Sequence, residues 1–456
     1  MIYDICIIGN GIVGSMSALE VSKMYPQKTI LFFNPEKPGG ASRAAGAMLN
    51  VFGEIDYGKQ FDNYQERKIL LGIDAQKEWK FFINQNKEFK KIKTANDTII
   101  FCKKNATELE KNCFSEIRRF SNLFNRNDTN KNSKIKKIKK TLPLNCDYSL
   151  IKNEGAIDTK LYFKICNNIL KRKKNVYIIK EEVNKILSKN NFYEIILNKK
   201  KIKVKKLIIS CGAYSKKLLG TMSHGIQDTY YGIGTALEIK SKKLSNIIPN
   251  NTVLRTPNRG STCGIHIVPR NNDEFYLGAG SNISTSPSLN PRIGTVEYLL
   301  TSLKNEISKD FDKDTMNTVI GFRPMSFDGR PLIGNLNKHK NIFFISGTKR
   351  DGLTYAPIIV KSILGWISED LRYLKEHFHG WEPERSPISY GDTDFAVKAY
   401  VSNKLAGLIE HDLVRKKIKT LKEDLANEAY RMHKIKIKKY GLKSKFGIHP
   451  EIINVK

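Results

Sequence analysis

The chain has 456 residues, among them 78 lysines and arginines against 45 aspartates and glutamates, and a formal net charge of +33. This length is too great for one small core, and it predicts two domains or one large discontinuous pair. The longest apolar runs, such as residues 30–33, fall far short of the roughly 20 residues that a membrane-spanning helix needs, and no basic segment precedes the apolar start of the chain, so we expect neither a membrane span nor a signal peptide.

The basic residues lie mainly in peripheral runs. Lysine runs occupy residues 134–140, 171–174, 199–206 and the last fifty residues, whereas residues 1–60 hold five basic and five acidic side chains. Two interpretations remain open: lysine fills solvated positions in a chain rich in Lys, Asn and Ile, or the chain has a polyanionic partner. Few aromatic residues interleave with the lysines, which disfavours nucleic acid as a partner without excluding it.

The seven cysteines are scattered and include no CxxC pair, and no histidine cluster stands at metal-ligand spacing. This pattern predicts a reduced, cytoplasmic protein without a metal site. The chain therefore lacks the CxxC motif that disulfide reductases need.

The N-terminal residues carry the first clear pattern. Residues 2–8 are nearly all apolar, as in a strand that is buried on both faces of a sheet. The turn GNGIVG follows at 9–14, residues 15–24 have helical spacing, and residues 29–33 form a second apolar strand. A GxGxxG turn between a strand and a helix predicts a dinucleotide site.

Each glycine of this turn has its own expected role. Gly9 permits the tight bend, Gly11 lets backbone amides approach a pyrophosphate, and Gly14 lets the helix pack closely on the strand. The helix N-terminus adds partial positive charge. Asn34 stands where an acidic residue normally binds the ribose hydroxyls, and Glu36 is a competing candidate.

The rest of the chain alternates between helical and strand-like patterns. In chain order we expect a glycine- and alanine-rich loop (39–48), a helix (58–90), a strand (98–101), a helix (105–124), a polar connection (127–140), a turn and helix (155–170), strands 176–179 and 204–210 flanking a hairpin, short antiparallel strands (230–284), a helix (297–307), and a strand, glycine turn and helix (320–366). Beyond residue 381 the composition changes, and leucines and isoleucines between 404 and 430 fall on one helical stripe.

Several of these stretches together resemble one family. The loop GGASRAAGAM, the helix GAIDTKLYFKICNNIL, the strand end LIISCGAYS, the strand GIHIVPR with LGAGS after it, and the C-terminal motifs GFRPMSFDGRPLIG and ISGTKRDGLTYAP occur in this order. The chain therefore resembles the FAD-dependent D-amino-acid oxidase (DAO) superfamily, which contains glycine oxidase and sarcosine oxidase. The resemblance covers about residues 1–375.

The resemblance implies a mixed α/β fold with a discontinuous, Rossmann-like FAD-binding domain. That domain would be assembled from residues 1–90, 150–225 and 320–378, and a substrate domain with an antiparallel sheet from 91–149 and 226–319. Residues 379–456 would form a basic helical C-terminal extension outside the resemblance.

The resemblance also implies which residues contact FAD. No cysteine lies in residues 320–350 to form a thioether tether, so we expect non-covalent FAD. The positions implied to contact it are Gly9, Gly11, Ile12, Val13, Gly14, Asn34, Ser42, Arg43, Ala45, Gly46, Met48, Val183, Gly212, Gly347, Arg350, Gly352, Leu353 and Thr354.

Two arginines and a histidine are the candidates for the substrate. Arg323 in GFRP and Arg350 in TKRDG match positions that contact substrate in glycine oxidase-like members, and an arginine fork can fix a carboxylate bidentately. His266 stands where such members carry a tyrosine. It could hydrogen-bond the substrate acid or act as a base on the ammonium group, or it could be a satisfied residue of the sheet.

The function implied is oxidation of the C–N bond of an amino acid or related amine by hydride transfer to flavin N5, followed by hydrolysis of the imine. Oxygen is the expected electron acceptor, with a quinone or another protein as alternatives. Two other functions stay open: a flavoenzyme that acts on an amino-acid-like modification of RNA, and a flavoprotein with a mainly structural or assembly role. A homo-oligomer is compatible with each.

Overall fold

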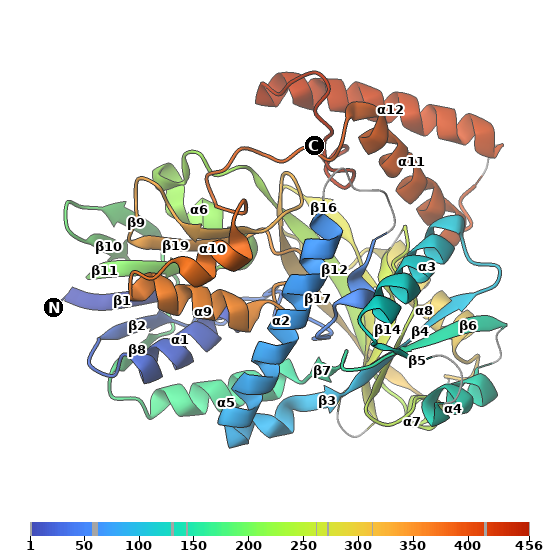
Figure 1. Cartoon of the computed structure of the whole chain (residues 1–456), viewed down its shortest axis with the longest axis horizontal. Helices are drawn as coiled ribbons and strands as arrows, with labels where there is room; N and C mark the ends of the chain where they lie inside the picture. The colour runs from blue at the N-terminus through green and yellow to red at the C-terminus, as the bar shows by residue number, and fades with distance from the viewer. Residues whose placement is uncertain are drawn as a thin grey trace.

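The computed structural model describes residues 2–56, 63–128, 132–142, 145–260, 262–270, 273–311, 313–414 and 417–455. Two large sheets lie side by side with helices packed around them, and a pair of helices near the C-terminus lies across the top of the view (Figure 1). The expected fold class is confirmed: a Rossmann-like α/β part, an antiparallel sheet and a helical C-terminal region.

Sheet A carries the glycine turn. In spatial order its main strands are β18 (Leu332–Asn335), β19 (Ile342–Ser346), β11 (Lys201–Ile209), β1 (Ile2–Ile8), β2 (Ile30–Phe33) and β8 (Val176–Ile179). β1 lies at the centre and pairs in parallel with both β2 and β11, while β18 pairs antiparallel with β19 at one edge. Because parallel strands end at the same side, the turns after β1, β2 and β11 meet at one edge of the sheet.

Sheet A is buried on both faces, as the nearly continuous apolar strands predict. Ile5 and Ile7 of β1 belong to one hydrophobic cluster, and Cys6 and Ile8 belong to another on the opposite face. The first cluster is covered by α1 (Ile12–Met24), α5 (Thr159–Lys171) and α9 (Ala356–Ile367), and the second by α6 (Ser215–Leu219) and the predicted hairpin, β9 (Lys185–Ser188) with β10 (Tyr193–Ile196).

Sheet B is the mainly antiparallel layer beside it. Its strands in order are β16 (Asn282–Ser284), β12 (Thr229–Lys240), β15 (Glu274–Gly280), β14 (Thr262–Pro269), β13 (Thr252–Arg255), β4 (Asp97–Lys103), β6 (Cys146–Ile151) and β5 (Asn127–Asp128), and β17 (Thr315–Ser326) pairs with β12. The helices α3 (Glu108–Leu123), α4 (Ser133–Thr141), α7 (Lys242–Ile247) and α8 (Ile293–Glu306) pack around this sheet.

The strands of sheet A all fall within the three segments expected for a flavin domain. The expected boundary at residue 320 falls inside β17, which is bonded to β12 from Thr315 to Ser326 and so is fixed to sheet B along its whole length. A two-stranded pair, β3 (Lys93–Ala95) with β7 (Ala156–Ile157), and the long helix α2 (Tyr64–Gln85) lie between the two sheets in Figure 1.

One predicted connection is partly helical. Residues 127–140 were expected to be a polar connection, but α4 begins at Ser133 within them. Ile135 and Ile138 are three positions apart, so both point to one face of a short helix and are buried while the lysines between them face solvent. The prediction failed because two buried apolar residues are enough to stabilise a short helix when sheet B supplies the surface against which they pack.

The C-terminal region forms two helices instead of one continuous stripe. α11 (Thr393–Glu410) and α12 (Ile418–Tyr440) are separated by a turn in which Asp412 has a φ of 53°, and they pack against each other. The single stripe predicted over 404–430 is therefore wrong. Ile409, Leu413 and Ile418 of that stripe are at least 43% exposed, because the turn takes them away from a common face.

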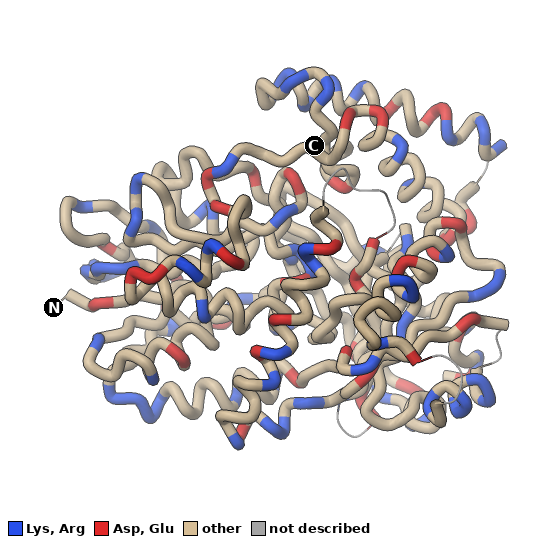
Figure 2. The backbone as a smooth tube through the Cα atoms, in the orientation of Figure 1, with Lys and Arg blue, Asp and Glu red and all other residues tan. Residues whose placement is uncertain are grey.

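Charged residues of both signs are spread over the visible parts of the molecule, and basic residues occur along the C-terminal helices (Figure 2). Among the described residues, no helix combines the length and apolar character that crossing a membrane requires.

A buried charge cluster ties the loop after β13 to two helices of sheet B. Arg259 donates to Glu110 of α3 at 2.9 Å and to Glu306 of α8 at 3.0 Å, and all three side chains are at most 5% exposed. Removing one member of such a cluster leaves uncompensated charge in a poorly solvated place.

We expect Arg259→Ala to destabilise the protein by about 3 kcal/mol, seen as a lower urea midpoint in circular dichroism. The matched control is Arg119→Ala, whose pair with Glu116 lies on an exposed helix face and should cost less than about 1 kcal/mol. Equal shifts in the two variants would contradict the prediction.

Candidate functional site

Three connected cavities run from the end of sheet A to the face of sheet B. The edge cavity, about 190 Å³, lies over the ends of β1, β2 and β11; the inner cavity, about 170 Å³, lies between the sheets; and the outer cavity, about 300 Å³, opens beyond it. Gly11, Ala41, Ser42, Ser210 and Gly212 line both the edge and the inner cavity. Cys263, Arg323, Thr348, Lys349 and Arg350 line both the inner and the outer cavity.

The glycine turn forms the junction of the edge and inner cavities. A Cβ on Gly9 would lie 2.4 Å from the carbonyl oxygen of Ser210, and one on Gly14 would lie 1.8 Å from that of Gly9, so both positions need glycine. A Cβ on Gly11 would approach Ser42 Oγ at 3.1 Å, on the cavity side. The N-terminus of α1 has no acidic residue in its first turn, and its first amide, that of Ile12, donates to Ser42 Oγ at 3.0 Å. The positive end of the helix dipole beside this hydroxyl suits an anion.

The glycine- and alanine-rich loop is held in place by Arg270, which directly follows β14, and by Tyr276 of β15. Arg270 donates to the carbonyl oxygens of Ala45 at 2.8 Å and Ile157 at 2.9 Å, and the hydroxyl of Tyr276 donates to that of Ala44 at 3.1 Å. The loop thereby forms one wall of the inner cavity, built almost entirely from backbone and methyl groups.

The structure gathers most of the predicted residues around these cavities. The edge cavity is lined by Gly9, Gly11, Ser42, Arg43, Val183 and Gly212; the inner cavity is lined by Gly11, Ile12, Val13, Ser42, Ala45, Gly46, Met48, Gly212, His266, Arg323, Arg350, Gly352, Leu353 and Thr354; and Gly347 lines the outer cavity. Gly14 packs against Gly9 behind the turn.

Asn34 has a different environment from the one predicted. Its amide nitrogen donates to Asn167 Oδ1 at 3.0 Å, which draws the side chain toward α5. The carboxylate that lines the edge cavity is that of Glu182, which is paired with Lys37 at 2.8 Å. Asn34 is thus not among the residues that line the edge cavity, whereas Glu182 is, and a contact between Asn34 and the ribose stays a prediction.

The cavities fit the FAD that the sequence predicts. The edge cavity and the inner cavity meet at a glycine turn and at a helix N-terminus whose first turn has no acidic residue, which suits a long ligand with an anionic centre. A Cβ on Gly46 would lie 2.8 Å from the ring of Tyr276, so glycine lets the loop pack closely against Tyr276 where both residues line the inner cavity.

Arg323 stands at the junction of the inner and outer cavities on β17. Its guanidinium donates to Ser281 Oγ at 3.3 Å and to the carbonyl oxygen of Gly280 at 3.1 Å, both of which are neutral acceptors. Its positive charge is therefore not matched by a protein carboxylate in these contacts, and it can attract an anionic group from the cavity.

Arg350 lies at the same junction but is already bound to carboxylates. Its Nε lies 3.1 Å from Glu54 Oε2, and its Nη2 lies 3.2 Å from Asp56 Oδ2. Burial raises the pKa of Glu54, but the charges of Arg350 and then Arg255 outweigh burial and lower this pKa to about 2. Arg350 thus serves mainly as an anchor for residues 50–56 in this structure.

His266 is buried beside the ring of Tyr276, with the two ring centroids 5.7 Å apart and the planes nearly parallel. Its Nδ1 lies 3.1 Å from the carbonyl oxygen of Gly264, which can only accept, so Nδ1 carries the proton and Nε2 is the free acceptor. Burial, with Arg255 nearby, lowers the pKa of His266 to about 3. The imidazole is therefore uncharged at neutral pH.

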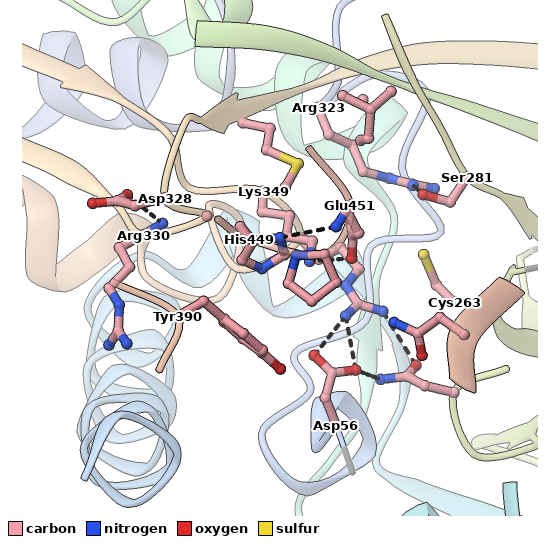
Figure 3. A pocket seen from close by; sticks show the side chains of 18 of the residues that line it. Asp56, Cys263, Ser281, Arg323, Asp328, Arg330, Lys349, Tyr390, His449 and Glu451 are labelled. Atoms are coloured by element: carbon pink, nitrogen blue, oxygen red, sulfur yellow. Dashed lines mark hydrogen bonds and ion pairs between the residues drawn. The ribbon is translucent and has the colours of Figure 1, made fainter. Parts of the chain in front are cut away.

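Sequence reasoning missed several residues of the site. Glu54 and Arg255 carry charges inside apolar stretches, MLNVFGEI and TVLR, and that interruption was the available signal. Tyr276 stands just before the motif LGAGS, and Lys349 lies within the motif ISGTKRDGLTYAP, but neither was singled out. Glu451, whose carboxylate lies 2.5 Å from Lys349 Nζ, comes from the C-terminal extension and had no sequence signal (Figure 3).

Comparisons with known proteins agree with this architecture. A family model described as FAD dependent oxidoreductase (DAO) matches residues 4–363. The glycine oxidase of Geobacillus kaustophilus is 17% identical over 84% of this chain and 99% of its own, with a TM-score of 0.69. An L-proline dehydrogenase from P. horikoshii is 16% identical over 84% of this chain and 97% of its own, with a TM-score of 0.65.

A third solved structure similar to this chain is an L-α-glycerophosphate oxidase from Mycoplasma pneumoniae with FAD bound. It is 19% identical over 81% of this chain and 95% of its own, with a TM-score of 0.62. At these levels of identity the likeness concerns the fold. The residues after 378, which form the C-terminal extension, lie beyond the part that the family model matches.

The buried neutral His266 should make stability depend on pH. The unfolded chain, whose histidines have an ordinary pKa of 6.5, binds more protons than the folded protein between that value and about 3. Stability therefore falls as the pH is lowered through this window. We expect the urea midpoint of His266→Gln to fall less steeply from pH 6.5 to pH 4 than that of the wild type.

The matched control is His379→Gln, which removes an imidazole that is 85% exposed. Its midpoint should follow the wild type across the same pH range. A His266→Gln curve parallel to the wild-type curve would show that this imidazole does not resist protonation.

Proposed function

The chain belongs to the DAO family of FAD-dependent oxidoreductases, whose model matches residues 4–363, and we propose that it oxidises the C–N bond of an amino acid or related amine. Bound FAD supplies the acceptor for a hydride from the carbon next to nitrogen. The observation that carries the proposal is Arg323, a cation whose hydrogen bonds within the described part of the chain go to the neutral acceptors Ser281 Oγ and Gly280 O, where the inner and outer cavities meet.

The residues proposed to hold FAD without a covalent bond follow the cavities. Gly11 and Ser42 would contact the pyrophosphate at the N-terminus of α1, and Val183 would lie on the adenosine side. Gly46 and the loop around it would face the ring. Leu353, just before α9, would approach the ring from the opposite wall of the inner cavity.

Arg323 would fix the substrate. A carboxylate bound by its guanidinium would stay at the mouth of the inner cavity, with the reacting carbon directed inward. Arg350 lies nearby but is bonded to Glu54 and Asp56, so a second carboxylate would have to compete with two that are already there. This division of roles is the reason for choosing Arg323 over Arg350 as the substrate arginine.

His266 would accept a hydrogen bond from the substrate amine. The carbon next to an ammonium group cannot give up its hydride until a proton leaves the nitrogen, because the nitrogen lone pair must stabilise the cation that develops on that carbon. The uncharged imidazole lines the inner cavity with Nε2 as an acceptor, and it can hydrogen-bond the amine without adding positive charge beside it. Its side chain is held by the hydrogen bond to Gly264 and by the ring of Tyr276.

The proposal is tested by the visible spectrum of the purified protein under anaerobic conditions. Glycine, sarcosine, proline and D-amino acids are added one at a time, and bleaching of the flavin bands by any of them supports an amine oxidoreductase. Bound flavin that dithionite reduces but no amine bleaches would contradict a small-amine substrate and favour the macromolecular alternative. L-α-Glycerophosphate is included as a non-amine substrate, and bleaching by it alone would overturn the proposal.

We expect Arg323→Met to raise KM for the active amine by roughly 10- to 100-fold, the worth of hydrogen bonds to a charged group. FAD content and the urea midpoint should remain those of the wild type. The matched variant Arg350→Met should instead lower the free energy of unfolding by about 3 kcal/mol, seen as a lower urea midpoint, because it leaves Glu54 and Asp56 without their shared cation. If Arg350→Met raised KM at full stability and Arg323→Met did not, the two roles would be exchanged.

A further inference from the structure

The C-terminal extension forms a wall of the outer cavity. Six of its residues that line this cavity are Tyr390, Phe395, Tyr400, Asn403, His449 and Glu451. In Figure 3 the side chains of Tyr390, His449 and Glu451 surround the same space as those of Arg323 and Lys349. The cavity next to the proposed substrate arginine is therefore closed by a part of the chain that lies outside the family match.

The first and last residues of the extension contact the turns that follow β17 and β19. Glu451 is paired with Lys349 at 2.5 Å, and Lys349 lies in the turn between the inner and outer cavities. A Cβ on Gly329 would lie 2.4 Å from the ring of His449, which shows how closely the segments pack. Arg385 is paired with the buried Asp328 in the loop before β18.

The middle of the extension, at the end of α11, contacts the loop after β13 of sheet B. The amide of Gly260 donates to Glu410 Oε1 at 3.0 Å, and a Cβ on Gly260 would lie 2.4 Å from the carbonyl oxygen of Asn403. α11 is thus in direct contact with the loop after β13. The extension therefore spans the outer cavity from one side to the other and is packed against both sides.

The size of the outer cavity exceeds what a simple amino acid needs. If the flavin ring occupies the inner cavity, a substrate carboxylate at Arg323 stands at the entrance to a further space of about 300 Å³. Glycine or sarcosine would leave most of that space to water. A substrate with a longer substituent would fill it while its reacting carbon still faces inward.

The chemistry of the lining specifies a polar substituent. Thr348 and Cys263 lie at the entrance, and Ser281, Asn282 and Asn403 line the space beyond. Hydroxyl and amide groups such as these lose hydrogen bonds to water when an apolar chain displaces it, and they regain them with a hydrogen-bonding chain.

We propose that the C-terminal extension is part of the substrate site and that the substrate is an amino acid carrying an extended polar substituent, which lies in the outer cavity. This inference rests on the proposed function and specifies the substrate class for the same site. The substituent can extend from the amine nitrogen or from the amino-acid side chain, and both routes lead past Arg323.

Two matched pairs of amines test the proposal on the flavin-loaded, full-length protein. N-(2-hydroxyethyl)glycine is compared with N-propylglycine, and each enantiomer of glutamine with that of norleucine, with sarcosine as the short reference. We expect a polar member to exceed both its apolar partner and sarcosine in kcat/KM by at least about tenfold. The pair that responds identifies whether the substituent is on nitrogen or on the side chain.

A variant of the extension provides the second test. Asn403→Trp places an indole in the outer cavity, whereas Ser402→Trp, one residue away on α11, changes an exposed position outside the cavity lining. We expect Asn403→Trp to lower kcat/KM for the polar amine by at least about tenfold and to change that for sarcosine less than twofold. Ser402→Trp should change neither.

The outcomes separate this inference from the proposed function. Oxidation of sarcosine with no preference for polar substituents, or an equal loss for both substrates in Asn403→Trp, would overturn the inference and leave the proposed function standing. Failure of every amine to bleach the flavin would overturn both.

Discussion

A single buried carboxylate connects the parts of the chain that surround the cavities. Glu54 follows the glycine- and alanine-rich loop, and it is bound by Arg255 of β13 at 3.0 Å and by Arg350 of the turn after β19 at 3.1 Å. These three residues come from segments far apart in sequence, and each is at least 88% buried as a side chain. Glu54 thus connects the loop beside the proposed ring to sheet B and to the turn before α9. Separating it from the two arginines would leave buried charges without a partner, which is costly.

This cluster also explains the different roles of the two substrate-candidate arginines. Both arginines were expected to bind the substrate, because a sequence shows the presence of a guanidinium and not the charges around it. Arg350 is surrounded by acidic groups, whereas the contacts of Arg323 are neutral. The distinction depends on Glu54 and Asp56, which lie almost 300 positions earlier in the chain, and it could be found only once the fold had brought them to Arg350.

The sequence predicted the elements whose signals are local. β1, the glycine turn and α1 follow from a continuous apolar run and from three spaced glycines, and the structure places them as expected. α4 was missed because its two isoleucines are a weak signal without the surface of sheet B, and the break between α11 and α12 was missed because a turn at Asp412 interrupts an otherwise helical pattern. Asn34 was assigned from its position at a strand end, but its neighbour Asn167 on another helix decides where its amide points.

The ion pair between Lys349 and Glu451 has an evolutionary consequence. Lys349 belongs to the part of the chain that the family shares, and Glu451 belongs to the extension, so each is a partly buried charge that depends on the other. Lys349 also has a φ of 48°, a backbone conformation that a side-chain-bearing residue adopts at some cost. In a homologue that lost the extension, replacing this lysine with glycine or a neutral residue would increase stability. Lysine at this position of the TKRDG motif should therefore be inherited together with the extension, and it can serve as a marker when genomes are searched for proteins of the same architecture.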